Sequence, residues 1–129
     1  MRSIGEASKL SGVAIETIRY YEREGIVPPT HRSASGRRLY GPDQIARLRF
    51  IRRSRDLGFS LSAIKSLLTL PLDDQATCSE ARAIGERHLE TVKAKIADLQ
   101  EHQRTLVRLV GQCRSDNPGC GLLGELFAE

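Results

Sequence analysis

The sequence predicts a mainly helical protein with an N-terminal winged helix-turn-helix domain, a long helix that pairs antiparallel with a second copy, and a short C-terminal loop. Three observations predict this fold class. Two short amphipathic segments flank a glycine-containing turn, a basic glycine turn follows them, and apolar residues then recur at steps of three and four from residue 81 to residue 113. With 129 residues, 40% of them hydrophobic, the chain can bury one small core and carry an appended helix.

The first two expected elements are short helices. One should run from Ile4 to Leu10, and the next should begin near Ile15 and stop at Gly25, because glycine is favoured directly after a helix C-terminus. Two short helices joined by a tight turn form a helix-turn-helix, whose second helix can enter the major groove of DNA. We therefore expect a helix-turn-helix at about residues 4–24.

A wing and two more helices should complete the N-terminal domain, residues 1–70. The letters RSASGRRLY place a glycine turn between basic residues, which predicts a small β-hairpin at about residues 30–40. Pro42 suits the first position of the next helix, and Ser60 can cap the one after it. The expected apolar positions of these two helices are Ile45, Leu48, Ile51 and Leu57, then Leu61, Ile64, Leu67 and Leu68.

A linker at residues 71–78 should lead into a coiled-coil dimerisation helix at residues 79–113. Residues 114–129 should then form a metal-binding loop and a short terminal helix. The seam of the coiled coil consists of Ala81, Gly85, Leu89, Val92, Ile96, Leu99, Gln103, Leu106, Val110 and Cys113. The preceding segments have too little spare apolar surface to cover this stripe, so a second copy should cover it.

The charge is concentrated in the N-terminal half. Residues 1–70 carry 13 Lys and Arg against 6 Asp and Glu, a net charge of +7, whereas the rest carries 7 against 10, a net charge of −3. A local basic surface is expected of a protein that binds a polyanion such as nucleic acid, although a solvated basic face would show the same count. No apolar run approaches a membrane span and no signal peptide is evident, so we expect a cytoplasmic protein without a membrane partner.

Three cysteines indicate a metal site. In a reducing compartment an odd number of cysteines favours metal ligands over disulfides. Cys78 and Cys113 are 35 residues apart, roughly 50 Å along a helix at about 1.5 Å per residue, so one chain cannot bring them together. An antiparallel pair of helices, with its two-fold axis near Ile96, would place Cys78 of one chain beside Cys113 and Cys120 of the other. This predicts two thiolate sites per dimer.

The ligand set indicates the class of metal. His88 and His102 each lie ten or eleven helical residues from the nearest cysteine, about 15 Å away, so the expected ligands are three sulfurs. Three thiolates suit Hg(II), Pb(II) or Cd(II), whereas Zn(II) would need a fourth ligand such as Asp116, a backbone group or water. The choice among these divalent ions stays open.

Three motifs, together with the cysteine positions, resemble one known family. IGEASKLSGVAIETIRYYEREGIVPP, SGRRLYG and RDLGFSL are similar to the signature of the MerR family of metal-responsive transcription regulators. The resemblance implies a homodimer that binds double-stranded promoter DNA. It further implies that bound metal makes the dimer distort the DNA, so that RNA polymerase is affected indirectly and metal resistance genes are activated.

The resemblance also implies roles for individual residues. Thr17, Arg19 and Tyr20 of the second helix would contact DNA, through base edges or phosphates. In the wing, Arg37, Arg38 and Tyr40 should hold backbone phosphates, the alternative being solvated charges on a turn.

Other classes of protein fit less well. Cu(I) and Ag(I) sensors of the family resemble the chain but use two cysteines and a small polar residue at the place of Cys78. A thiol redox sensor is a further alternative. Family members that hold iron–sulfur clusters carry four closely packed cysteines, whereas this chain has three cysteines. An enzyme is not expected, since the sequence has no Cys/His pair in register, no phosphate-binding glycine loop and no paired carboxylates in a plausible pocket.

Overall fold

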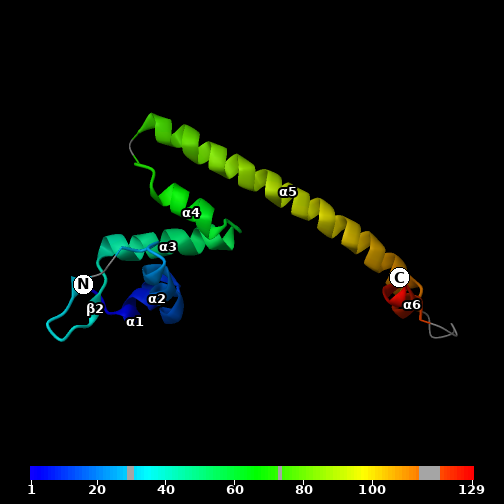
Figure 1. The fold of residues 1–129 in the computed structure, drawn as a ribbon, viewed down its shortest axis with the longest axis horizontal. Coiled ribbons are helices and arrows are strands. Elements are labelled where there is room, and N and C mark those ends of the chain that lie inside the picture. Colours follow the sequence, from blue (N-terminus) through cyan, green and yellow to red (C-terminus); the bar gives the residue numbers. More distant parts are fainter. Residues whose placement is uncertain (29–30, 73, 114–119) are drawn as a thin grey trace. The chain divides into compact units, whose positions relative to one another are not determined.

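The computed structural model describes residues 1–28, 31–72, 74–113 and 120–129. These residues form two compact units, 1–81 and 82–129. In chain order (Figure 1) the elements are α1 (Ile4–Ser11), α2 (Ile15–Arg23), β1 (His31–Arg32), β2 (Arg38–Leu39), α3 (Pro42–Asp56), α4 (Leu61–Leu68), α5 (Gln75–Gly111) and α6 (Gly121–Phe127). The predicted mainly helical fold is confirmed.

The first unit begins with the predicted helix-turn-helix. Helix α1 starts where the N–H of Glu6 donates to the Ser3 hydroxyl across 3.2 Å, and it ends at Gly12. Gly12 has φ 76°, a left-handed conformation that ends a helix at little steric cost for glycine. Three residues, 12–14, separate α1 from α2.

The predicted wing is a two-stranded antiparallel hairpin. His31 of β1 stands opposite Leu39 of β2, and the turn between the strands contains Gly36 at φ 84°. Beyond the hairpin, Tyr40 and Arg2 exchange two backbone hydrogen bonds of 2.7 and 2.8 Å. The wing is therefore joined to the start of the chain.

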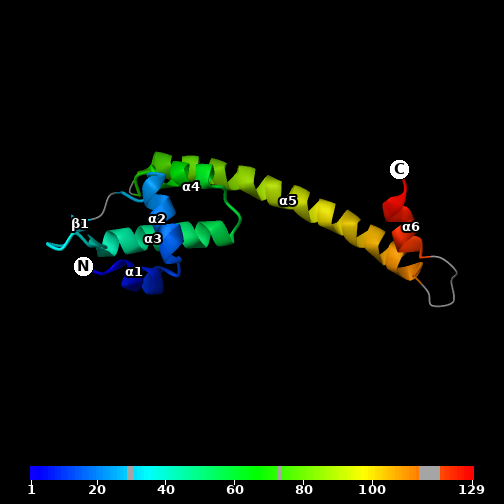
Figure 2. The same ribbon diagram turned by 60° about the horizontal axis from the view of Figure 1, so that its bottom comes forward.

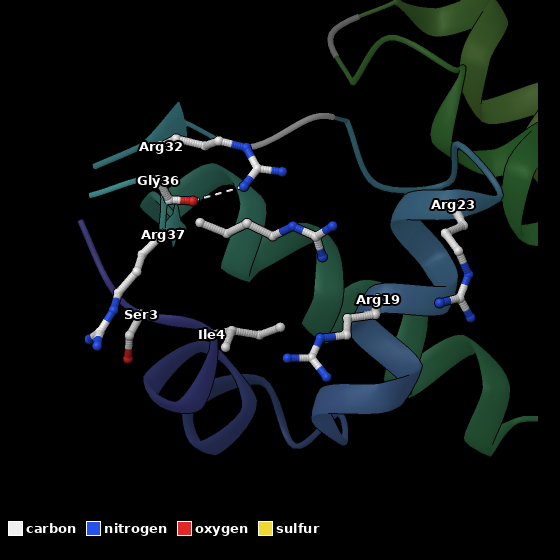
Figure 3. Close-up of a pocket in the computed structure, with 8 residues that line it drawn as sticks. Ser3, Ile4, Arg19, Arg23, Arg32, Gly36 and Arg37 are labelled. Carbon is white, nitrogen blue, oxygen red and sulfur yellow. Dashed lines mark hydrogen bonds between the residues drawn. The ribbon is translucent and has the colours of Figure 1, made fainter. Parts of the chain in front are cut away.

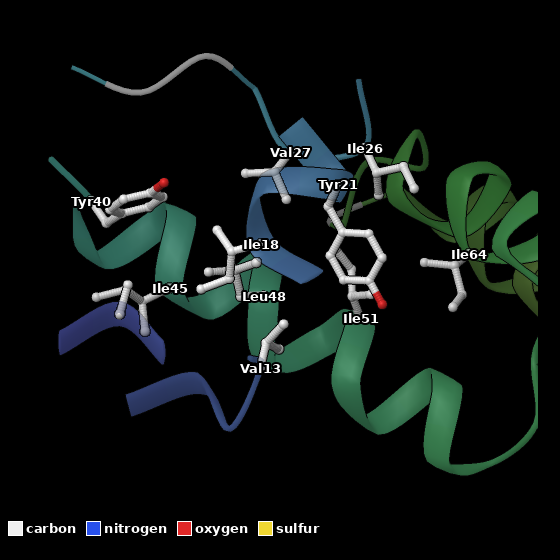
Figure 4. Packing of buried hydrophobic residues seen from close by; sticks show 11 residues of the cluster. Val13, Ile18, Tyr21, Ile26, Val27, Tyr40, Ile45, Leu48, Ile51 and Ile64 are labelled. Carbon is white, nitrogen blue, oxygen red and sulfur yellow. The ribbon is translucent and has the colours of Figure 1, made fainter. Parts of the chain in front are cut away.

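The core of this unit lies where α1, α2 and α4 pack around α3 (Figure 4). Burying an aliphatic side chain of this size contributes about 1.5–3 kcal/mol. The largest fully buried side chains are Tyr40, Ile18, Leu48, Ile51, Ile64 and Val27. The expectation for Leu57 is wrong: it follows the last turn of α3 and is 68% exposed.

Several arginines of α3 bind backbone carbonyls within the unit. The Nε of Arg49 donates to the carbonyl of Leu10 in α1 across 3.0 Å, and the Nε of Arg47 donates to the carbonyl of Ile26 across 3.0 Å. Arg52 donates to the carbonyl of Gly12 and pairs with Asp56. Helix C-termini leave carbonyls without intrahelical donors, so these charges stabilise the fold.

Helix α5 is continuous over 37 residues, and α6 lies beside its C-terminal end (Figure 2). It begins at Gln75, four residues before the predicted start, because the Asp74 carboxylate accepts the N–H of Ala76 across 3.0 Å. Cys78 therefore lies in the first turn of the helix, and the predicted linker at 71–78 is too long. No helix in the described residues is long and apolar enough to cross a membrane.

Candidate DNA-binding and metal-binding sites

A basic cleft of about 570 Å³ lies between α2, the start of α1 and the wing (Figure 3). Among its described lining residues are five arginines and no carboxylate. In Figure 3 the Arg19 side chain extends from α2 toward Ile4 and the wing. The residues that line the cleft are Ser3, Ile4, Arg19, Arg23, Arg32, Gly36, Arg37 and Arg38. A concave surface with this lining is suited to an anionic ligand.

The residues proposed for the second helix differ in their surroundings. Arg19 lines the cleft and is exposed, and its Nη1 lies 2.9 Å from Oε1 of Glu16, a weak surface ion pair that phosphate can replace. Tyr20 is 39% exposed, and Thr17 is half-buried near the start of α2. The structure thus brings Arg19 together with Arg37 and Arg38, while Tyr20 and Thr17 lie outside the cleft lining.

Tyr40 does not have the predicted role. Its side chain is fully buried, and its hydroxyl donates to Oε1 of Glu22 in α2. Burial and the hydrogen bond to the Glu22 carboxylate both raise the pKa of the Tyr40 hydroxyl. A buried hydroxyl with its donor already used cannot hold a phosphate, so the prediction for Tyr40 is wrong. Arg38 is half-buried and pairs with Oε2 of the same Glu22 at 2.9 Å.

The thiols of Cys113 and Cys120 lie together at the end of α5. Their Sγ atoms are 3.1 Å apart and both residues are exposed. The hydrogen bond with Cys120 raises the pKa of Cys113, whereas the backbone N–H of Leu123 and then the Cys113 thiol lower the pKa of Cys120. The shared hydrogen bond therefore moves the pKa values of the two thiols in opposite directions, and two sulfurs at this distance can bind one soft metal ion.

Cys78 is exposed in the first turn of α5. Within the described residues, no three His, Cys, Asp or Glu side chains gather to hold a metal ion. Residues 114–119 of the predicted metal-binding segment 114–129, including Asp116, lie outside the described residues. One chain thus shows two thiols in contact and a third near the other end of the helix.

Comparison with known proteins identifies the family. Residues 2–70 match the MerR HTH family regulatory protein, and residues 45–109 match a MerR DNA-binding description. The chain belongs to the MerR family. The resemblance found in the sequence is confirmed, and this family consists of DNA-binding transcription regulators, not enzymes.

Two curated relatives extend over most of this MerR-family chain. It is 45% identical over 125 residues to heavy metal-dependent transcription regulator 2 of Rhizobium meliloti. The alignment covers 96% of this chain and 85% of that relative. It is 43% identical over 114 residues to the transcriptional regulator ZntR of Escherichia coli, covering 88% of this chain and 81% of ZntR.

Two solved structures are similar over nearly the whole MerR-family chain. The first is a transcription regulator of Ralstonia metallidurans in complex with lead(II), at 35% identity and TM-score 0.80, covering 98% of this chain and 99% of that one. The second is MerR of Bacillus megaterium in complex with mercury(II), at 34% identity and TM-score 0.74, covering 98% and 100%.

Two arginines in the cleft of the MerR-family chain were not predicted from the sequence as DNA-binding residues. Arg23 follows Arg19 by four residues, so both fall on one face of α2. That spacing was the available signal for Arg23. Arg32 lies in β1, and its Nη1 donates to the carbonyl of Gly36 across 2.8 Å, as the dashed line in Figure 3 shows.

Proposed function

We propose that this MerR-family chain is a metal-responsive activator of transcription that binds promoter DNA as a homodimer. The observation that carries the metal part is the pair of exposed thiols of Cys113 and Cys120, with Sγ atoms 3.1 Å apart. Two thiols this close can bind one ion, and soft sulfur ligands favour thiophilic divalent metals, here Hg, Cd, Pb or Zn. The names of the relatives and the two metal complexes among the similar structures support this class of effector.

The DNA-binding surface proposed is the basic cleft with the outer face of α2. Arg19, Arg37 and Arg38 would hold phosphates or base edges, and Thr17 and Tyr20 would contact DNA beside them. Arginine suits this task because its guanidinium donates two parallel hydrogen bonds to phosphate or guanine.

The third ligand proposed is Cys78 of a second copy. The seam residues of α5 leave an apolar stripe, since Leu89, Ile96 and Leu99 are 51%, 50% and 64% exposed in the single chain. Two such helices packed antiparallel would cover both stripes and bring Cys78 of each chain to the thiol pair of the other. This gives two sites per dimer, each with three sulfurs.

The proposed signal passes from the thiolate site to the DNA. Cys78 is the fourth residue of α5 and lies within the first unit, residues 1–81, so a ligand bond at Cys78 can shift that unit in its own chain. Metal changes the population of a DNA-distorting arrangement only if it binds that arrangement more tightly. RNA polymerase would then respond indirectly, through the shape of the promoter, in the cytoplasm.

Mixed dimers test the proposed site directly. One chain carries Cys78→Ser, and the other carries Cys113→Ser with Cys120→Ser. If ligands come from both chains, the mixed dimer keeps one complete site and responds to Cd(II) in a transcription assay, while both parent homodimers do not. Failure of the mixed dimer to respond, with promoter binding intact, would contradict the shared site.

A competition titration distinguishes the remaining alternatives. Affinities for Hg(II), Cd(II), Pb(II), Zn(II) and Cu(I) are measured with promoter transcription in parallel. Activation by a divalent ion supports the proposal, and activation by Cu(I) alone would favour a monovalent sensor. Activation by oxidant without metal would favour a thiol redox sensor.

A further inference from the structure

We propose that Arg108 and Glu125, with the close approach of Gly121 to Gln112, form a clamp that holds Cys120 against Cys113. The inference rests on the proposed metal site, because it assigns positioning residues to the same thiol pair. In the described part of the chain Arg108 and Glu125 bond to each other and the two thiols bond to each other, so the effect of the clamp would be on the distance between the two sulfurs.

The ion pair joins α6 back to α5. Nη2 of Arg108 lies 3.0 Å from Oε1 of Glu125, and Nη1 lies 3.2 Å from Oε2, so both carboxylate oxygens are used. Arg108 belongs to the last turn of α5, five residues before Cys113, and Glu125 lies five residues after Cys120. The two ends of the clamp thus enclose the two thiols symmetrically along the chain.

The bidentate geometry makes this pair more directional than a single surface contact. It fixes the rotation of α6 as well as its distance from α5, because two parallel hydrogen bonds define a plane. The ion pair lowers the pKa of Glu125 and raises that of Arg108, so both groups are charged at neutral pH. Among the described residues of this unit, the other ion pairs, Arg82 with Glu86 and Lys93 with Glu90, each join two residues of α5.

A backbone approach supports the same placement. A Cβ added to Gly121 would lie 2.6 Å from the Cβ of Gln112, too close for any real pair of side-chain carbons. Gln112 precedes Cys113 and Gly121 follows Cys120, so this contact lies directly beside the sulfurs. A Cβ added to Gly124 meets nothing within 4 Å, although Gly124 is in the same helix.

Thiol–disulfide exchange measures how strongly the fold favours contact between the sulfurs of Cys113 and Cys120. In a Cys78→Ser background, the full chain is equilibrated with reduced and oxidised glutathione, and the fraction of the Cys113–Cys120 disulfide is measured by mass spectrometry. For each protein disulfide formed, two electrons and two protons pass to one glutathione disulfide, which becomes two molecules of glutathione. The equilibrium constant gives the effective concentration of the Cys113 thiol relative to the Cys120 thiol. The measurement is made without metal.

Arg108→Gln and Glu125→Gln should each lower this effective concentration about two- to fivefold, the range expected for an exposed ion pair. The double variant should lose no more than either single variant, and the exchange of Arg108→Glu with Glu125→Arg should restore part of the loss. Gly121→Ala should lower it as well. Arg82→Gln and Gly124→Ala are the matched controls, expected to match the parent.

Equal effective concentrations in Arg108→Gln and Arg82→Gln, with helix content unchanged, would overturn the clamp. So would a Gly121→Ala variant that matches Gly124→Ala. Cd(II) affinity is measured on the same variants with Cys78 restored and should fall in parallel. If the parent binds no Cd(II), the proposed metal function fails, but the exchange result still decides whether the clamp holds the thiols.

Discussion

Arg38 of the wing pairs with Glu22 of α2, with 2.9 Å between Nη1 and Oε2. The other oxygen of Glu22 accepts the hydroxyl of Tyr40, so one carboxylate joins the end of the wing to the second helix of the helix-turn-helix. The Glu22 side chain is only 11% exposed, which weakens competition from water. Glu22 therefore joins the wing to α2, the two elements proposed to contact DNA.

Glu22→Ala should lower the free energy of unfolding of the N-terminal unit by about 1–3 kcal/mol, because the buried Tyr40 hydroxyl and Arg38 both lose their acceptor. Urea unfolding followed by circular dichroism measures this. Glu16→Ala removes the partner of Arg19 at a site where the carboxylate is 82% exposed, and it should change the free energy by less than about 0.5 kcal/mol. Equal losses in the two variants would contradict the role of Glu22.

Stability at alkaline pH should depend on Tyr40. Its pKa in the folded state lies above the ordinary value of 10.0, so folding favours the protonated hydroxyl. That contribution is complete below pH 10 and is lost as pH rises through the pKa of the folded state. The free energy of unfolding is measured with urea at pH values below and above 10. It should fall less with rising pH in Tyr40→Phe than in the parent. Burial also raises the pKa of Tyr21. Tyr21 is present in both proteins, so its contribution cancels in the comparison.

The features predicted correctly depend on neighbours along the chain. Gly12 and Gly25 end helices, Pro42 begins α3, and the N–H of Ala63 donates to the Ser60 hydroxyl as expected of a cap. The spacing of three and four residues likewise predicted the long helix, since it reports the period of one element. These signals need no knowledge of tertiary partners.

The features missed depend on partners far along the chain. Tyr40 was assigned to phosphate from the family resemblance and its place in the wing, but its acceptor, Glu22, is 18 residues earlier. Arg49 binds a carbonyl 39 residues away, so charge counting overstated the surface available to DNA. The approach of Cys113 to Cys120 was expected, but no periodic pattern in the sequence between them specifies the 3.1 Å between their Sγ atoms.

Arg37→Ala should weaken binding to all DNA sequences to a similar degree. If Arg37 holds a phosphate, its loss should reduce the slope of log affinity against log salt concentration by about one. Fluorescence anisotropy with promoter DNA and with an unrelated duplex, at several salt concentrations, measures both quantities. Arg82→Ala in α5 removes an exposed arginine outside the cleft and should leave the slope unchanged. A loss confined to the promoter would assign Arg37 to base recognition instead.

Cysteine crosslinking should show both the pairing and the direction of the α5 helices. In a chain whose three native cysteines are replaced by serine, Ile96→Cys should give a covalent dimer on oxidation, because an antiparallel pair places the two-fold axis near this residue. Leu106→Cys should not, since antiparallel pairing sets it opposite Gly85, whereas a parallel pair would set each seam residue against its own copy. Asp98→Cys is the control, about 200° around the helix from Ile96. Efficient crosslinking at Leu106 as well as Ile96 would establish a parallel pair and remove the shared thiolate site.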